Sequence, residues 1–155
     1  MTLTFCYTMY IMKNQEETNM KLSEIKKRLV EEINSEQEQK LLLLVQTLCD
    51  GLTQQIRDKY KHAVNDYYTY KVGKKYIKVI SVHGDSRGGQ QSVWGFINRA
   101  DFTSPKGITF KCGDVLKSAG WATPALNAPR GNLFENGDEG YVITGMRQYG
   151  PDYLR

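Results

Sequence analysis

The feature that most constrains the fold is a change in the hydrophobic pattern at Tyr67. Between residues 20 and 60, apolar residues recur at every third or fourth position, as on one face of an amphipathic helix. From Tyr67 onward, aromatic and β-branched residues come in short runs separated by glycine and proline, which is typical of strands. We therefore expect an α+β fold, in which an N-terminal helical hairpin packs on a small, mostly antiparallel β-sheet.

The hairpin is expected to consist of two helices. Ser35 and Glu38 have the spacing of a capping box, which predicts that the second helix starts at Ser35. Gly51 predicts a kink in that helix, because glycine costs about 1 kcal/mol inside a helix. The apolar stripe of the first helix is formed by Leu22, Ile25, Leu29 and Ile33. The hairpin is either a helical layer that covers the sheet or an element that docks a partner or a second copy.

The expected division of the chain is a peripheral segment at 1–19, the hairpin at 20–66 and a β-rich domain at 67–155, the last two forming one compact unit. Strands are expected at 67–70, 76–82, 92–97, 108–111 and 141–144. A glycine-rich loop from His83 to Gln90 and a turn around Pro105 separate some of these strands.

The stretch Phe110–Asn132 organises the β-rich domain. Asp114 has the character of a helix N-cap, and Val115 to Ala119 would then form one apolar helical turn. Pro124 and Pro129 exclude regular structure afterwards, so the chain should form a rigid wrap. The wrap should hold Arg130 and Asn132 in fixed positions. Arg130 would bind a ligand there or, equally, tie down Asp114 or the C-terminal carboxylate. Trp121 is expected to anchor the wrap by packing.

Four pieces of the sequence carry a resemblance to a known family. They are VGKKYIKV (72–79), SVWGFI (92–97), FKCGDVLKSAGWATPALNAPRGN (110–132) and GPDYLR (150–155). In this order they resemble a family of small, mostly uncharacterised proteins that are encoded by tailed bacteriophages. The resemblance covers roughly residues 67–155 and departs from the family at Gly120, where serine is commoner, and in the loop after Val82. It implies a phage origin and carries over no catalytic residue.

The composition limits the functions that are open to the chain. Its 155 residues suffice for one domain, and no apolar run is long enough for a membrane-spanning helix. Cys6, Cys49 and Cys112 are widely spaced and odd in number, so we expect reduced thiols and no metal site. Net charge is uneven, at −1 for residues 1–66, +7 for 67–130 and −2 for 131–155. The basic middle favours an anionic partner.

The basic strands with interleaved aromatic residues are the strongest functional signal. Lysine and arginine could neutralise phosphates there, and aromatic rings could stack on bases. The alternative is that Tyr68, Tyr70, Tyr76, Trp94 and Phe96 form the core beneath the helices while the lysines face solvent. The predicted ligand-binding residues are Lys75, Arg87, Trp94, Lys111, Lys117, Trp121, Arg130 and Asn132.

No catalytic signature accompanies this pattern. The glycine-rich loop precedes a strand, whereas phosphate-binding glycine loops open a helix. His83 lies near Asp85 but has no evident nucleophile beside it. We therefore expect no enzymatic activity, no catalytic residue and no cofactor.

These observations predict a non-enzymatic, phage-encoded accessory protein in the host cytoplasm, without membrane association. It would bind nucleic acid or a small nucleotide through its basic, aromatic sheet, and a nucleotide-sequestering antagonist of host defence is one specific form of this hypothesis. The alternative is a protein-interaction module that docks a host or virion protein through the helical hairpin, which could also form a homodimer.

Overall fold

The computed structural model describes residues 2–84, 89–135 and 149–152; within 2–20, the only side chain described is that of Met12. The chain divides into two units, residues 1–39 and residues 40–155. The predicted strand at 141–144 lies outside the described residues, as does Arg87.

The predicted helical hairpin is wrong, because a single helix, α1, runs from Thr2 to Lys59. No proline occurs before Pro105, and the residues around Ser35 are mostly glutamate, glutamine and lysine, which favour helix. Ser35 and Glu38 have the spacing of a capping box, but no helix starts at Ser35, so the pair caps no helix end. The helix also continues through Gly51, next to which Leu52 is buried in the core. Tertiary packing there offsets the weak helix propensity of glycine.

The predicted α+β class is confirmed. Four strands form an antiparallel sheet in the order β1-β2-β3-β6. Their bounds are β1 Tyr67–Val72, β2 Tyr76–Val82, β3 Gln91–Asn98 and β6 Val115–Leu116. The three strands predicted at 67–70, 76–82 and 92–97 are therefore present, each within a residue or two of its expected bounds.

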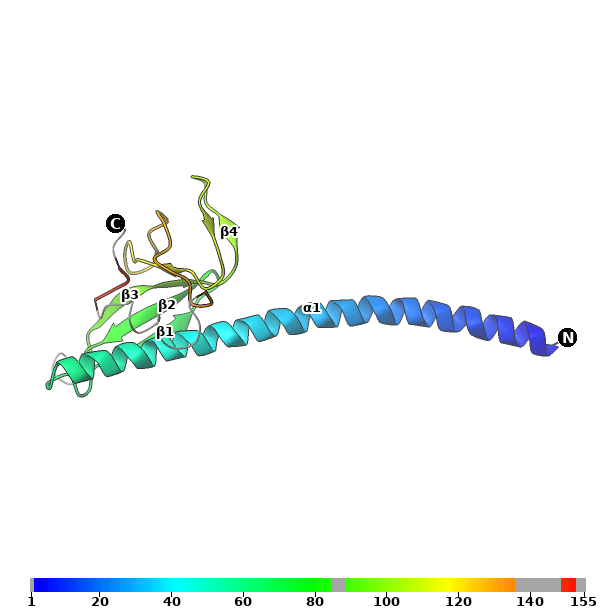
Figure 1. Cartoon of the computed structure of the whole chain (residues 1–155), viewed down its shortest axis with the longest axis horizontal. Coiled ribbons are helices and arrows are strands. Elements are labelled where there is room, and N and C mark those ends of the chain that lie inside the picture. Colours follow the sequence, from blue (N-terminus) through cyan, green and yellow to red (C-terminus); the bar gives the residue numbers. More distant parts are fainter. Residues whose placement is uncertain (1, 85–88, 136–148, 153–155) are drawn as a thin grey trace. The chain divides into compact units, whose positions relative to one another are not determined.

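One face of the sheet is apolar and packs on the C-terminal part of α1, which runs along the sheet in Figure 1. The buried residues of α1 on this side are Leu41, Val45, Leu48, Cys49, Leu52 and Ile56. They pack against the sheet residues Tyr68, Ile77, Val79, Trp94, Ile97 and Val115. Burial, followed by the charge of Asp50, raises the pKa of the Cys49 thiol to about 12, so this thiol stays protonated at neutral pH.

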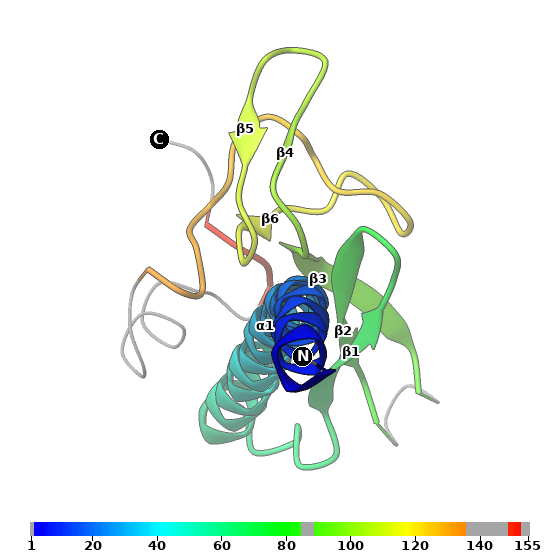
Figure 2. The same ribbon diagram turned by 90° about the vertical axis from the view of Figure 1, so that its right-hand side faces the viewer.

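A smaller cluster lies on the opposite face, where Phe96, Phe110 and Leu116 are buried. Phe110 comes from a separate two-stranded sheet of β4, Phe102–Thr103, and β5, Thr109–Phe110 (Figure 2). The turn predicted around Pro105 joins these strands, and the Ser104 N–H donates to the Ile108 carbonyl at 2.8 Å.

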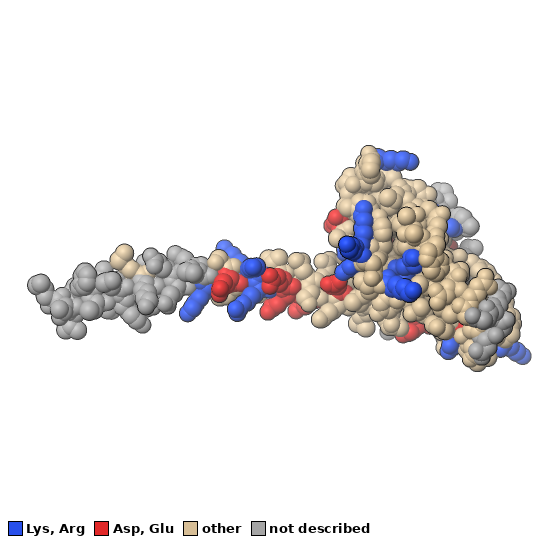
Figure 3. All heavy atoms as spheres, turned by 180° about the vertical axis from the view of Figure 1, so that it is seen from behind, with Lys and Arg blue, Asp and Glu red and all other residues tan. Residues whose placement is uncertain are grey.

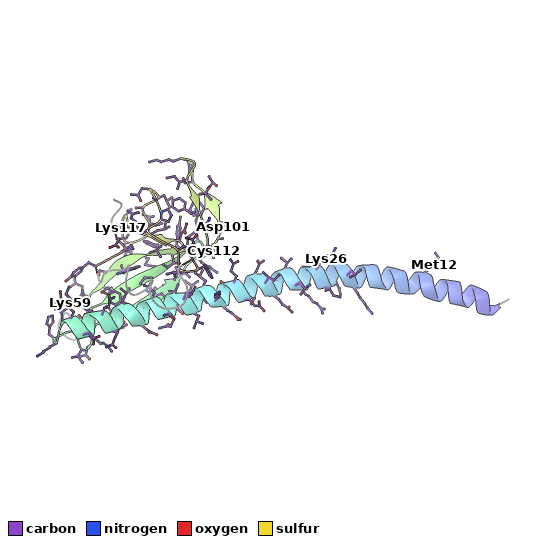
Figure 4. The ribbon with its side chains drawn as sticks, viewed as in Figure 1. Met12, Lys26, Lys59, Asp101, Cys112 and Lys117 are labelled. Atoms are coloured by element: carbon purple, nitrogen blue, oxygen red, sulfur yellow. The ribbon has the colours of Figure 1, made fainter. Side chains whose placement is uncertain are left out.

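The helical turn predicted after Asp114 is wrong, since Val115 and Leu116 form β6. The Asp114 carboxylate accepts from the Lys111 N–H at 2.7 Å, so it closes the preceding turn instead of capping a helix. Cys112 lies in the same turn, and its N–H donates to the Asp101 side chain at 2.7 Å (Figure 4).

The predicted wrap returns along β6. The Arg130 N–H donates to the Val115 carbonyl at 2.7 Å, and the Val115 N–H donates to the Gly131 carbonyl at 2.8 Å. Isolated bridges join Asp114 to Asn132 and Ser118 to Pro124. The wrap is therefore held by backbone hydrogen bonds at both ends.

Replacing Gly113 by alanine should destabilise the fold. Gly113 has φ +88°, and an added Cβ would lie 2.5 Å from Cδ2 of Phe134. The positive φ alone costs about 1–3 kcal/mol for a non-glycine residue, and the collision adds to it. Gly120→Ala is the matched control, because nothing lies within 4 Å of its added Cβ. Urea denaturation of both variants tests this, and equal midpoints would contradict it.

Candidate functional site

The face of the sheet opposite α1 carries an unbalanced positive charge. Lys71 and Lys78 are Cα partners on β1 and β2, and like charges placed directly opposite each other destabilise a sheet. Among the described residues from Tyr67 to Ala100 there are five lysines and arginines and no aspartate or glutamate. Figure 3 shows lysine and arginine side chains gathered over the β-rich unit. A bound anion would relieve this repulsion.

Two lysines and four aromatic rings follow one another across this face in what we call the lysine–aromatic row. Its members, in spatial order, are Trp121, Lys78, Phe96, Tyr76, Phe102 and Lys75. Lys78 Nζ lies 4.6 Å from the centroid of the Trp121 ring and 5.9 Å from that of Phe96. The Tyr76 centroid is 6.1 Å from Phe96 and 6.3 Å from Phe102. At the far end, Lys75 Nζ lies 3.8 Å from the Phe102 centroid.

The two ends of the row are exposed, Tyr76, Phe102 and Lys78 are half-buried, and Phe96 is buried. Trp121 is 51% exposed and Lys75 is exposed, whereas Phe96 is 2% exposed. A tight turn presents Trp121, since the N–H groups of Ala119 and Gly120 both donate to the Thr123 carbonyl. The sequence predicts that Trp121 anchors the wrap by packing, but about half of its surface is exposed, which leaves one side of the indole open for stacking. A cation over an exposed ring contributes about 0.5–1 kcal/mol.

Two predicted ligand-binding residues are structural. Trp94 is 2% exposed and belongs to the core beneath α1, so its ring cannot stack on a ligand. Asn132 is 4% exposed, and its Nδ2 donates to Asp114 Oδ1 at 2.8 Å and to the Cys112 carbonyl at 2.9 Å. Asn132 therefore ties the end of the wrap to the turn at Asp114.

Three further predicted residues stand apart from the row. Arg130 Nη1 donates to the Ala128 carbonyl at 2.6 Å and to Asn127 Oδ1 at 3.0 Å, within its own loop. Lys111 is exposed, with its Nζ 3.9 Å from Glu135 Oε1. Lys117 is half-buried at the start of the wrap (Figure 4). Of the predicted ligand-binding residues, Lys75 and Trp121 belong to the lysine–aromatic row.

The predicted set omits the other four members of the row, which are Lys78, Phe96, Tyr76 and Phe102. Alternation along β2 places Lys78 on the same face as Tyr76, so this signal was available in the sequence. The contact between Lys78 and Trp121 had no such signal, because it depends on how the wrap returns across the sheet.

The side chain of His83 contacts Asp66, although Asp85 is the acidic residue nearer to it in the sequence. Its Nδ1 lies 3.3 Å from Asp66 Oδ2, and Asp66 Oδ1 accepts from the Gly84 N–H at 3.0 Å. Desolvation raises the pKa of Asp66, but the hydrogen bonds from Gly84 and His83, with the charges of His83 and His62, outweigh it and lower that pKa. Asp66 therefore joins the segment after α1 to the end of β2.

Among residues 21–84, 89–135 and 149–152, no three His, Cys, Asp or Glu side chains converge as a metal site would require. In the same part of the chain, no helix has the length and apolar character needed to cross a membrane.

Acid should remove the stabilisation that Asp66 provides. Because its folded-state pKa is lowered, the contribution is fully present above about pH 4, the ordinary range of an aspartate, and is lost as pH falls through the lower folded value. Melting temperatures of the wild type and Asp66→Asn should differ most above pH 4 and converge below it. Asp58→Asn, an exposed helix residue, is the control. A difference that stays constant to pH 2 would contradict this assignment.

Comparison with known proteins gives one match. No curated protein and no solved structure is detectably similar to the chain. A family model described as a family of unknown function (DUF7717) matches residues 7–151, which include α1 from residue 7, the whole sheet and the wrap. The chain therefore belongs to this family of unknown function.

Proposed function

We propose that this protein binds single-stranded nucleic acid through the lysine–aromatic row on the outer face of its sheet. The observation that carries the proposal is the pairing of Lys78 with the half-exposed ring of Trp121, 4.6 Å apart, beside the like-charged Lys71. A base would stack on the solvent-facing side of the indole, and the two lysines would lie within reach of the adjoining phosphate.

The shape of this surface favours a strand over a single nucleotide. The accessible ends of the row, Trp121 with Lys78 and Phe102 with Lys75, are separated by the buried Phe96 and the half-buried Tyr76. An extended ligand can contact both ends, and proteins that bind single strands combine stacking rings with a basic track in this way. A cavity of about 310 Å³ does lie between Ser104–Lys106 and Ala125–Asn127, but it is not part of the row.

The proposed role is that of a non-enzymatic accessory protein of a bacteriophage, acting in the host cytoplasm. The resemblance of residues 67–155 to small phage proteins supports this setting, and the positive charge of the sheet supports the class of ligand.

Removing the Trp121 ring should weaken binding. Stacking on an aromatic side chain is worth about 1–3 kcal/mol per base, so Trp121→Ala should raise the Kd for a fluorescein-labelled oligothymidylate by about five- to 150-fold. Fluorescence anisotropy measures this. Tyr149→Ala, which removes another exposed aromatic side chain outside the row, should leave the Kd unchanged.

An absence of oligonucleotide binding by the wild type at about 50 mM salt would refute the proposal, since electrostatic binding is strongest at low salt. Competition by a mononucleotide as strong as that by the oligonucleotide would indicate a nucleotide site instead of a strand-binding surface.

Neutralising Lys71 and Lys78 should reduce the salt dependence of binding. Each lost phosphate contact lowers the slope of log K against log salt by about 0.7 for a single strand. The double variant Lys71→Gln/Lys78→Gln should therefore show a smaller slope than the wild type. Lys59→Gln/Lys61→Gln removes the same charge from exposed positions outside the row and is the control. Equal slopes for the two double variants would exclude the row as the binding surface.

A further inference from the structure

One exposed stretch of α1 carries an apolar stripe that none of the described residues covers. Every described side chain from Lys21 to Lys40 is exposed. The stripe consists of Leu22 (49% exposed), Ile25 (49%), Leu29 (50%) and Ile33 (61%). Spacings of three and four residues place these side chains on one side of the helix over about three turns. Helices gain most of their stability in water by burying such a stripe, so its exposure points to a partner.

The charges along this stretch are divided between its two halves. The first half holds Lys21, Lys26, Lys27 and Arg28, with Glu24 as its one acidic residue. The second half holds Glu31, Glu32, Glu36 and Glu38, and no lysine or arginine occurs between residues 29 and 39. The stretch is therefore basic toward its N-terminal end and acidic toward its C-terminal end. Two copies that run in opposite directions would place each basic half against an acidic half.

The positions of the charges around the helix agree with this direction. At 100° per residue, Lys21 and Arg28 lie along the same edge of the apolar stripe as Glu32, and Glu36 continues the line of the stripe itself one turn beyond Glu32. In an antiparallel pair this edge faces the same edge of the partner, so Lys21 would face the acidic half of the partner, while Arg28 lies near the middle of the paired stretch. In a parallel pair the two basic halves would lie beside each other and repel.

We propose that residues 21–38 form an antiparallel two-stranded coiled coil with a second copy of this chain. The second copy is the occupant because the stretch is complementary to itself in this one direction. Lys26 marks the basic half in Figure 4. The pairing involves no residue of the lysine–aromatic row, so it stands independently of nucleic-acid binding.

The association state of the full-length protein tests the interface. Analytical ultracentrifugation should find the wild type as a dimer at micromolar concentration, and Ile25→Asp/Leu29→Asp should raise the dimer dissociation constant at least tenfold. Val64→Asp changes another exposed apolar residue outside the helix and should leave the dimer intact. Circular dichroism of each variant shows whether the sheet domain remains folded. A wild type that stays monomeric at high micromolar concentration would overturn the proposal.

Charge reversal tests the direction. Lys21→Glu/Arg28→Glu and Glu32→Lys/Glu36→Lys should each weaken self-association at least tenfold, and an equimolar mixture of the two variants should form a heterodimer. A parallel pair predicts instead that Lys21→Glu/Arg28→Glu associates with the wild type, and this result would overturn the antiparallel arrangement. Dimerisation of each variant at wild-type strength would likewise overturn it.

Discussion

The hydrogen bond between Asn132 and Asp114 holds the β-rich unit in the form that the proposed site requires. Both side chains are buried, and their contact of 2.8 Å joins the start of β6 to the end of the wrap. Asn132 also accepts from the Phe134 N–H through its Oδ1, so both ends of its amide are used. A buried carboxylate is tolerated only when it is hydrogen-bonded, and Asp114 has this amide and the Lys111 N–H as donors. With both ends of the wrap fixed, its middle carries Trp121 to Lys78.

The two faces of the sheet have different roles because different elements pack against them. The inner face meets α1, and its aliphatic and aromatic residues stabilise the fold by leaving water. The outer face is covered only in part, by β4, β5 and the wrap, around Phe96, Phe110 and Leu116. Lysines occupy the part of this face that these elements leave exposed. Lys71 and Lys78 repel each other, and the described strands contain no acidic residue that could offset this repulsion. A rigid sheet with an unneutralised face is suited to a charged ligand.

Helix α1 shows how one sequence pattern leads to two outcomes. Its apolar stripe is buried from Leu41 to Ile56, where the sheet supplies a surface, and exposed from Leu22 to Ile33. The apolar spacing is that of an amphipathic helix in both parts. The exposed part carries a charge division that the buried part lacks, and this division is the basis for the proposed antiparallel pairing.

Local sequence determined the class of each segment: helix before Tyr67, then the strands at 67–70, 76–82 and 92–97, because side-chain period and β-propensity act over a few residues. It also located the positive charge in the middle of the chain. Only the tertiary structure decided that Ser35 and Gly51 lie inside one helix, that Asp114 closes a turn instead of capping a helix, and that Trp94 is buried while Trp121 is exposed. These outcomes depend on which surfaces meet after the chain folds back, and a contact such as Lys78 with Trp121 joins residues that no local pattern relates.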